Sequence, residues 1–185
     1  EINSAGAWLG SIPEVHGLTD ITGFGLAGHL VEMAEGARVR MVVDTDSVPI
    51  YPAAETLARE GVFPGGAYRN MDAYNSRLSF GDDWDIDRQL VFTDPQTNGG
   101  LLLSVEPQAA EDILARLHEF GCAESSIIGE VDEDLQLLLE NLGGESHRVL
   151  WGHRTVSPDF QGELVVVSLL TNTSVSDAEV HLGDG

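Results

Sequence analysis

Three short segments of the chain carry residues that could bind a phosphate and a metal ion. The first, Thr19-Asp20-Ile21-Thr22-Gly23-Phe24-Gly25, has an aspartate at the expected end of a strand and two glycines where a helix should begin. Glycines let backbone N–H groups approach an anion, and a helix N-terminus adds partial positive charge. Asp20 would supply a hard oxygen ligand for Mg²⁺ shared with the phosphates. An ordinary tight turn with a capping aspartate has the same pattern, so this segment alone leaves both interpretations open.

The second segment is Asp94-Pro95-Gln96-Thr97-Asn98-Gly99-Gly100. Pro95 fixes φ after an acidic residue, and the paired glycines permit backbone geometries that other residues avoid. A hairpin connection is the simplest interpretation. However, the loop is longer than the two residues that a hairpin requires, which favours a functional loop.

The third segment, Pro64-Gly65-Gly66-Ala67-Tyr68-Arg69-Asn70, places an arginine close to a diglycine. The planar guanidinium of Arg69 could clamp a phosphate. A surface loop with one solvated arginine fits the composition equally well.

The elements expected around these segments alternate between helices and strands. Apolar periodicity and helix-ending residues predict helices, strands and one irregular region. The helices are expected at 3–11, 26–34, 52–60 and 107–120, the strands at 19–20, 39–43, 90–92, 101–105, 126–131 and 135–139, and the irregular region at 62–89. The fold class predicted is α+β, with helices packed on a mixed β-sheet.

The composition changes after Asn141, where Gly143 and Gly144 suggest a break. Residues 1–141 are predicted to form one domain, and residues 142–185 a tail of unknown role. The tail holds a strong strand candidate at 164–170 and a weaker one at 175–182. Because residues 1–141 already contain enough alternating elements to close a core, the tail is expected to be dispensable for folding.

The chain is strongly acidic, with 31 Asp and Glu residues against nine basic residues, all of them arginine, and a net charge of −22. Such a charge repels nucleic acid and anionic membranes, so neither is expected as a partner. The acids are scattered, as on a solvated surface, which favours a protein from a high-salt cytoplasm over an ordinary acidic protein. No apolar stretch reaches the length of a membrane span and no signal peptide is present, which favours a cytoplasmic protein.

Two single residues invite a functional role that their surroundings do not favour. Cys122 follows a predicted helix with no histidine near it in sequence, so a buried, unreactive thiol is expected. His29 lies on the helix next to the first segment, where a packed or capping role is expected rather than metal binding.

Together, the three segments resemble the C-terminal domain of the selenide, water dikinase (selenophosphate synthetase) family, within the aminoimidazole ribonucleotide synthetase-like superfamily. The resemblance covers residues 1–141. It implies ATP-dependent conversion of selenide to selenophosphate, with release of AMP and orthophosphate. It also implies that Asp20 is a Mg²⁺ ligand at the ATP phosphates. The residues that the three motifs would place around the phosphates are Thr22, Gly23, Gly25, Arg69, Gln96 and Thr97.

In that family the nucleophilic cysteine or selenocysteine and an essential lysine belong to an N-terminal half, and this chain contains no lysine. It also begins without Met, so it is expected to be a C-terminal half that is inactive alone and contributes no catalytic residue. Its expected partner is the N-terminal ATP-binding half, in a full enzyme that forms a homodimer. Two alternatives remain open, namely another ATP-dependent kinase or synthetase of the superfamily and a non-catalytic binding module.

Overall fold

The computed structural model describes residues 3–81, 84–132, 148–152 and 162–167. The described strands form one sheet in the order β1-β4-β7-β5-β2-β6-β3, and every neighbouring pair is antiparallel. The strands are β1 (Val15–Asp20), β2 (Arg40–Asp44), β3 (Leu78–Ser79), β4 (Leu101–Val105), β5 (Ser126–Asp132), β6 (Arg148–Gly152) and β7 (Gly162–Val167). The α-helices are α1 (Gly6–Leu9), α2 (Gly25–Ala37), α3 (Pro52–Arg59), α4 (Gly65–Tyr74), α5 (Ile86–Thr93) and α6 (Pro107–Phe120), and short 3₁₀ helices cover Thr45–Ser47 and Asn75–Arg77.

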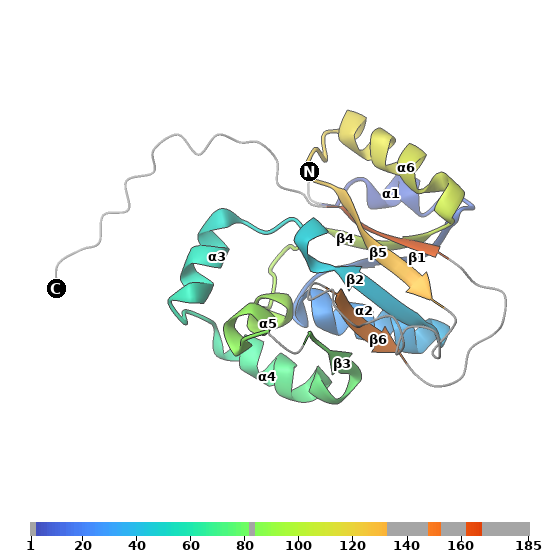
Figure 1. Ribbon diagram of the computed structural model, residues 1–185. Helices are drawn as coiled ribbons and strands as arrows, with labels where there is room; N and C mark the ends of the chain where they lie inside the picture. Colours follow the sequence, from blue (N-terminus) through green and yellow to red (C-terminus); the bar gives the residue numbers. More distant parts are fainter. Residues whose placement is uncertain (1–2, 82–83, 133–147, 153–161, 168–185) are drawn as a thin grey trace, which may run out of the picture.

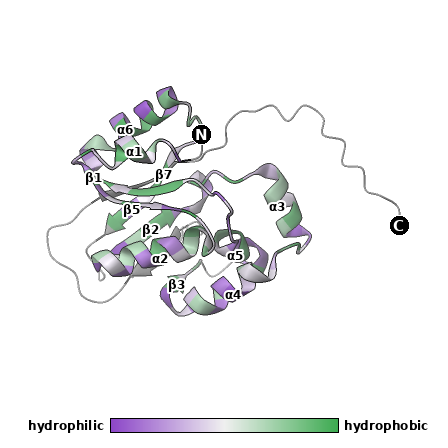
Figure 2. Ribbon diagram, turned by 180° about the vertical axis from the view of Figure 1, so that it is seen from behind, coloured by the Kyte–Doolittle hydropathy of each residue, from purple (hydrophilic) through white to green (hydrophobic). Residues whose placement is uncertain are grey.

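Helices cover both faces of this sheet. Helices α1 and α6 lie on one face, and α2 lies on the other with α4 and α5 beside it (Figures 1 and 2). Strand β4 separates the two cores because successive side chains of a strand point to opposite faces. Leu102 packs in the core with α2, whereas Leu101 and Leu103 pack in the core with α6. The α+β class expected from the sequence is confirmed, but the sheet is antiparallel throughout rather than mixed.

Two expectations for the middle of the chain are wrong. Residues 62–89 are not irregular, because they contain α4, β3 and the start of α5, and residues 90–92 are helical rather than a strand. In α4 the buried residues Ala67, Met71 and Tyr74 follow a helical spacing that the two glycines at its start obscure. Asp85 caps the N-terminus of α5, because its carboxylate accepts a hydrogen bond from the Arg88 N–H at 2.9 Å.

Two strands of the sheet come from beyond residue 141. Strand β7 pairs with β4 and β5, and β6 pairs with β2 and β3. The candidate strand at 164–170 therefore corresponds to β7, whereas the candidates at 135–139 and 175–182 lie outside the described residues. Because β7 lies between two strands of the first 141 residues, we now expect a chain that ends at Asn141 to be less stable than the full chain.

Candidate functional site

The first two segments are held together by backbone hydrogen bonds at the place where β1 ends and β4 begins. The N–H of Ile21 donates to the Gly100 carbonyl at 3.0 Å, and the Gly99 N–H donates back to the Ile21 carbonyl at 2.9 Å. The Gln96 N–H donates to the Thr22 carbonyl at 2.9 Å. Two loops more than 70 residues apart in sequence therefore form one unit. The third segment joins this unit as well, and we call the three segments together the junction (residues 20–25, 65–70 and 93–100).

Asn70 of α4 connects the third segment to the other two. Its side-chain amide Nδ2 donates to the Gly23 carbonyl at 2.8 Å and to the Thr93 carbonyl at 2.9 Å. Sequence reasoning selected its neighbour Arg69 and missed this role, although the Arg-Asn pair was part of the motif. A polar residue one helical turn after a diglycine was the only signal that could have indicated it.

Two glycines allow the segments of the junction to pack closely against one another. Gly25 has φ +69°, and a Cβ atom there would lie 2.8 Å from the Asp94 carbonyl oxygen and from the Thr93 carbonyl carbon. At Gly66 a Cβ atom would lie 2.5 Å from Cγ of Pro95. Both distances are shorter than van der Waals contact allows, so any side chain at these positions would push the segments apart.

His29 fixes the turn that precedes α2. Its Nε2 accepts a hydrogen bond from the Thr22 N–H at 3.0 Å, so the ring proton belongs on Nδ1, which lies 3.4 Å from a Glu32 carboxylate oxygen. The expectation that His29 is packed or capping is confirmed as a packed role, because the side chain is buried and binds the turn before α2.

The turn at residues 22–25 leaves two backbone N–H groups for a ligand. The Thr22 N–H is bound by His29, and the Gly25 N–H donates to the Thr22 carbonyl at 3.0 Å. The N–H groups of Gly23 and Phe24 have no hydrogen-bond partner among the described residues, and both residues are exposed. They lie at the N-terminus of α2, where the helix dipole favours an anion.

Three further predicted site residues are exposed. Asp20 ends β1, immediately before the turn, and Thr97 lies in the loop between α5 and β4. Arg69, on α4, makes no ion pair or hydrogen bond with any residue that the structure describes. No group of three or more His, Cys, Asp or Glu residues within the described ranges is arranged to hold a metal ion. Asp20 fits Mg²⁺ as a single protein ligand, because this ion is commonly held by one or two carboxylates, phosphate oxygens and water.

The side-chain amide of Gln96 contacts Asp94. Its Nε2 donates to the Asp94 carbonyl at 3.2 Å and to the carboxylate Oδ2 at 3.1 Å. Burial raises the pKa of Asp94 above its ordinary value, and the hydrogen bond from Gln96 offsets part of this rise. The other carboxylate oxygen, Oδ1, is buried and has no partner among the described residues. Sequence reasoning did not select Asp94, although it begins the second motif.

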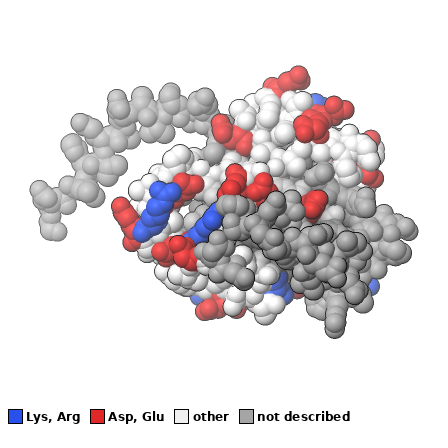
Figure 3. Space-filling view, viewed as in Figure 1, with Lys and Arg blue, Asp and Glu red and all other residues white. Residues whose placement is uncertain are grey.

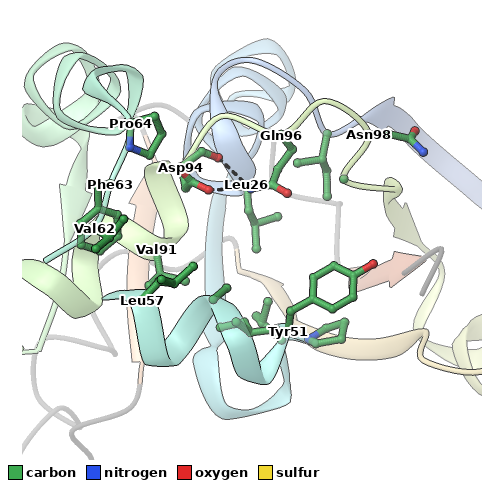
Figure 4. A pocket seen from close by; sticks show the side chains of 16 residues that line it. Leu26, Tyr51, Leu57, Val62, Phe63, Pro64, Val91, Asp94, Gln96 and Asn98 are labelled. Atoms are coloured by element: carbon green, nitrogen blue, oxygen red, sulfur yellow. Dashed lines mark hydrogen bonds between the residues drawn. The ribbon is translucent and has the colours of Figure 1, made fainter. Parts of the chain in front are cut away.

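A cavity of about 470 Å³ adjoins the junction on the side of α3. Tyr51 and Leu57 line it from the α3 side and lie across from Asp94 and Gln96 (Figure 4). Most of its other lining residues are apolar. The cavity has the size and the mixed lining, mostly apolar with a few polar groups at one end, that are typical of binding sites.

Comparison with known proteins gives the same assignment as the motifs. Residues 7–138 match the family model described as AIR synthase related protein, C-terminal domain. The chain belongs to this family.

None of its described helices is long and apolar enough to cross a bilayer. Cys122 is buried, and burial raises the pKa of its thiol, as the sequence led us to expect for an unreactive cysteine.

Within the AIR synthase related family, the chain is similar to proteins named selenide, water dikinase. It is 41% identical over 131 residues to the protein of Burkholderia orbicola. The aligned residues cover 71% of this chain and 37% of that relative. It is 42% identical over 118 residues to that of Shewanella sp. strain MR-4, covering 64% of this chain and 33% of the relative. The chain therefore spans about a third of the length of these relatives.

Proposed function

We propose that this chain forms one wall of the ATP·Mg²⁺ site of a selenide, water dikinase, which converts selenide, ATP and water to selenophosphate, AMP and orthophosphate. One observation carries the proposal. Three glycine-bearing segments meet at a single turn that presents two unpaired N–H groups at a helix N-terminus, next to an exposed aspartate. The names of the similar proteins supply the substrate.

In this proposal the residues of the junction have two different tasks. Gly23 and Phe24 donate their N–H groups to a phosphate oxygen, and Arg69 neutralises phosphate charge from α4. Thr22, Gly25 and Gln96 hold the turn in shape through the contacts described above, and Thr97 offers a hydroxyl at the edge of the loop. Asp20 binds Mg²⁺, which would neutralise the charge on the phosphates when it is bound.

The nucleophile and the lysine are proposed to belong to a separate N-terminal half. The chain contains no lysine, and its one cysteine is buried in the α6 core, on the opposite face of the sheet from α2. We therefore expect the purified chain to release no AMP from ATP and selenide. In the complete enzyme, which we propose to be a cytoplasmic homodimer, this chain positions the phosphates and the metal.

The acidic surface is proposed to be an adaptation to high salt. Acidic side chains are spread over the visible face, and basic ones are few (Figure 3). Mutual repulsion among 31 acidic residues weakens as ions screen the charges. Stability should rise steeply between low and molar KCl, and an unchanged melting temperature over that range would reject this part of the proposal.

Backbone amide shifts provide the test of the phosphate site. In a ¹H–¹⁵N spectrum of the 185-residue chain in high KCl, addition of Mg·ATP should shift Gly23 and Phe24 most. The amides of Thr22 and Gly25 should move less, because their hydrogen bonds are already made within the turn. Mg·ATP shifts confined to other parts of the chain, or no shift at millimolar concentrations, would contradict the proposal.

A further inference from the structure

His29 contacts both residues that flank Gly23 in the turn before α2. Its Nε2 accepts the hydrogen bond from the Thr22 N–H at 3.0 Å and lies 3.3 Å from the Thr22 hydroxyl oxygen. Its ring also packs against the ring of Phe24, and the two ring centroids are 5.6 Å apart. One buried side chain therefore holds the turn on both sides of Gly23, the residue whose N–H is open to a ligand together with that of Phe24.

Phe24 is held from a second direction, by residues of α2 and α4. Its ring lies edge-on to that of Tyr74, with the centroids 6.0 Å apart. A Cβ atom at Gly28 would lie 2.5 Å from Cβ of Phe24 and 2.8 Å from Cε2 of Tyr74, so only glycine allows this approach. Packing of the ring on two neighbours restricts the backbone of Phe24, and with it the direction of the N–H group.

The hydrogen bond to Thr22 requires one particular tautomer of His29. Nε2 can accept only when it carries no proton, so the neutral ring carries its proton on Nδ1. Nδ1 lies 3.4 Å from a carboxylate oxygen of Glu32, and an acceptor at this position favours the same tautomer. The other tautomer would direct its N–H at the Thr22 N–H and open the turn. Glu32, His29 and Thr22 therefore form a chain in which each contact specifies the next.

We propose that His29 is a positioning residue for phosphate binding, which aligns the N–H groups of Gly23 and Phe24, and that Glu32 maintains its tautomer. This inference rests on the proposed function. Without His29, the Thr22 N–H would lose its partner and the turn could rotate, so the two open amides would no longer converge on one phosphate. His29 acts through the turn and not on the phosphate, because Thr22 and Glu32 occupy its two ring nitrogens.

The affinity of the 185-residue chain for Mg·ATP, measured from amide shifts, separates positioning from stability. His29→Leu removes the acceptor and should weaken binding about tenfold. His29→Gln places an acceptor oxygen as many bonds from the backbone as Nε2, and it should bring the affinity back to within about threefold of the wild type.

His118→Leu is the matched control. It removes a histidine hydrogen bond of 2.9 Å, to the Ser125 carbonyl, from α6 on the opposite face of the sheet. The affinity for Mg·ATP should change less than about twofold in this variant, although stability falls. An equal loss of affinity in His29→Leu and His118→Leu, or no rescue by His29→Gln, would overturn the positioning role.

The tautomer gives a second measurement, which needs no nucleotide. In a long-range ¹H–¹⁵N spectrum of the histidine rings, Nδ1 of His29 should carry the proton and Nε2 should carry none. In the free chain, His29→Leu should move the amide signals of Gly23 and Phe24, whereas His29→Gln should leave them near their wild-type positions. A proton on Nε2, or unmoved amide signals in His29→Leu, would overturn the assignment. If both signatures hold while Mg·ATP shifts neither amide in the wild-type chain, the proposed function fails, and only the part of His29 in shaping the turn stands.

Discussion

The junction and the residues Tyr51, Leu57, Val62 and Phe63, which we call the α3 face, adjoin the same cavity but are built in opposite ways. In the junction, backbone approaches backbone, and a single added methyl group at Gly25 would lie 2.8 Å from two atoms of residues 93–94. Around the α3 face, large side chains are about half exposed beside an open space of about 470 Å³. Close packing fixes one geometry, and loose packing tolerates several. The junction therefore holds its segments in one geometry, whereas the side chains of the α3 face have room to rearrange.

The largest expected effect is that of Gly25→Ala. An alanine would need φ +69°, and its Cβ would meet the backbone of residues 92–94. The left-handed conformation and the overlap together should lower the free energy of unfolding by about 3 kcal/mol. Gly36→Ala is the control, because Gly36 is an exposed residue of the same helix with open space around it, and it should raise stability by about 0.5–1 kcal/mol. Urea unfolding in high KCl measures both, and equal effects would show that the junction is not tightly closed.

A smaller loss is expected for Asn70→Ala. The substitution removes two hydrogen bonds, to the carbonyls of Gly23 and Thr93, and should cost about 1.5 kcal/mol. Asn75→Ala is the control, because the exposed side chain of Asn75 makes no hydrogen bond with a described residue. A loss no greater than that of the control would mean that Asn70 does not hold the segments together.

The contribution of Asp94 to stability should depend on pH. At pH 7 it should lower stability, whereas Gly25 and Asn70 raise it. Burial raises its pKa in the folded chain, so the folded state favours the protonated carboxyl. Stability from this group is therefore present below the ordinary pKa of an aspartate and is lost as the pH rises through the raised pKa. Asp94→Asn should stabilise the chain at pH 7 and have less effect near pH 3.5. Unfolding curves of both forms across this range measure the difference, and a gain that is independent of pH would refute the assignment.

The smallest effect is expected beside the α3 face. Ala54 lines the cavity and is exposed, so Ala54→Leu adds apolar volume where space exists. The two residues have similar helix propensities, and stability should change by less than about 0.5 kcal/mol. A loss comparable to that of Gly25→Ala would show that the two regions are equally tight, and would remove the basis of the comparison.

The sequence predicted the parts of the molecule whose spacing is local. Helix α6, strand β4 and the turn before α2 were expected because proline, apolar alternation and paired glycines specify them within a few residues. Helix α4 was missed because its two initial glycines conceal the helical spacing of Met71 and Tyr74. The link from Asn70 to two distant carbonyls depends on tertiary packing, which no local pattern encodes. For the same reason, the sequence could not show which amide groups of the turn stay unpaired.

Substitution of Asp20 tests the central claim most directly. In the complete enzyme to which we propose this chain belongs, Asp20→Asn keeps the size and one acceptor oxygen but removes the charge that is proposed to hold Mg²⁺ against the phosphates. We expect selenide-dependent AMP release to fall about a hundredfold, on the order of 3 kcal/mol, with the fold intact. Asp112→Asn, an equal change of charge on the exposed side of α6, should leave turnover unchanged. Near-normal turnover of Asp20→Asn at every Mg²⁺ concentration would contradict the account and leave Asp20 a structural residue.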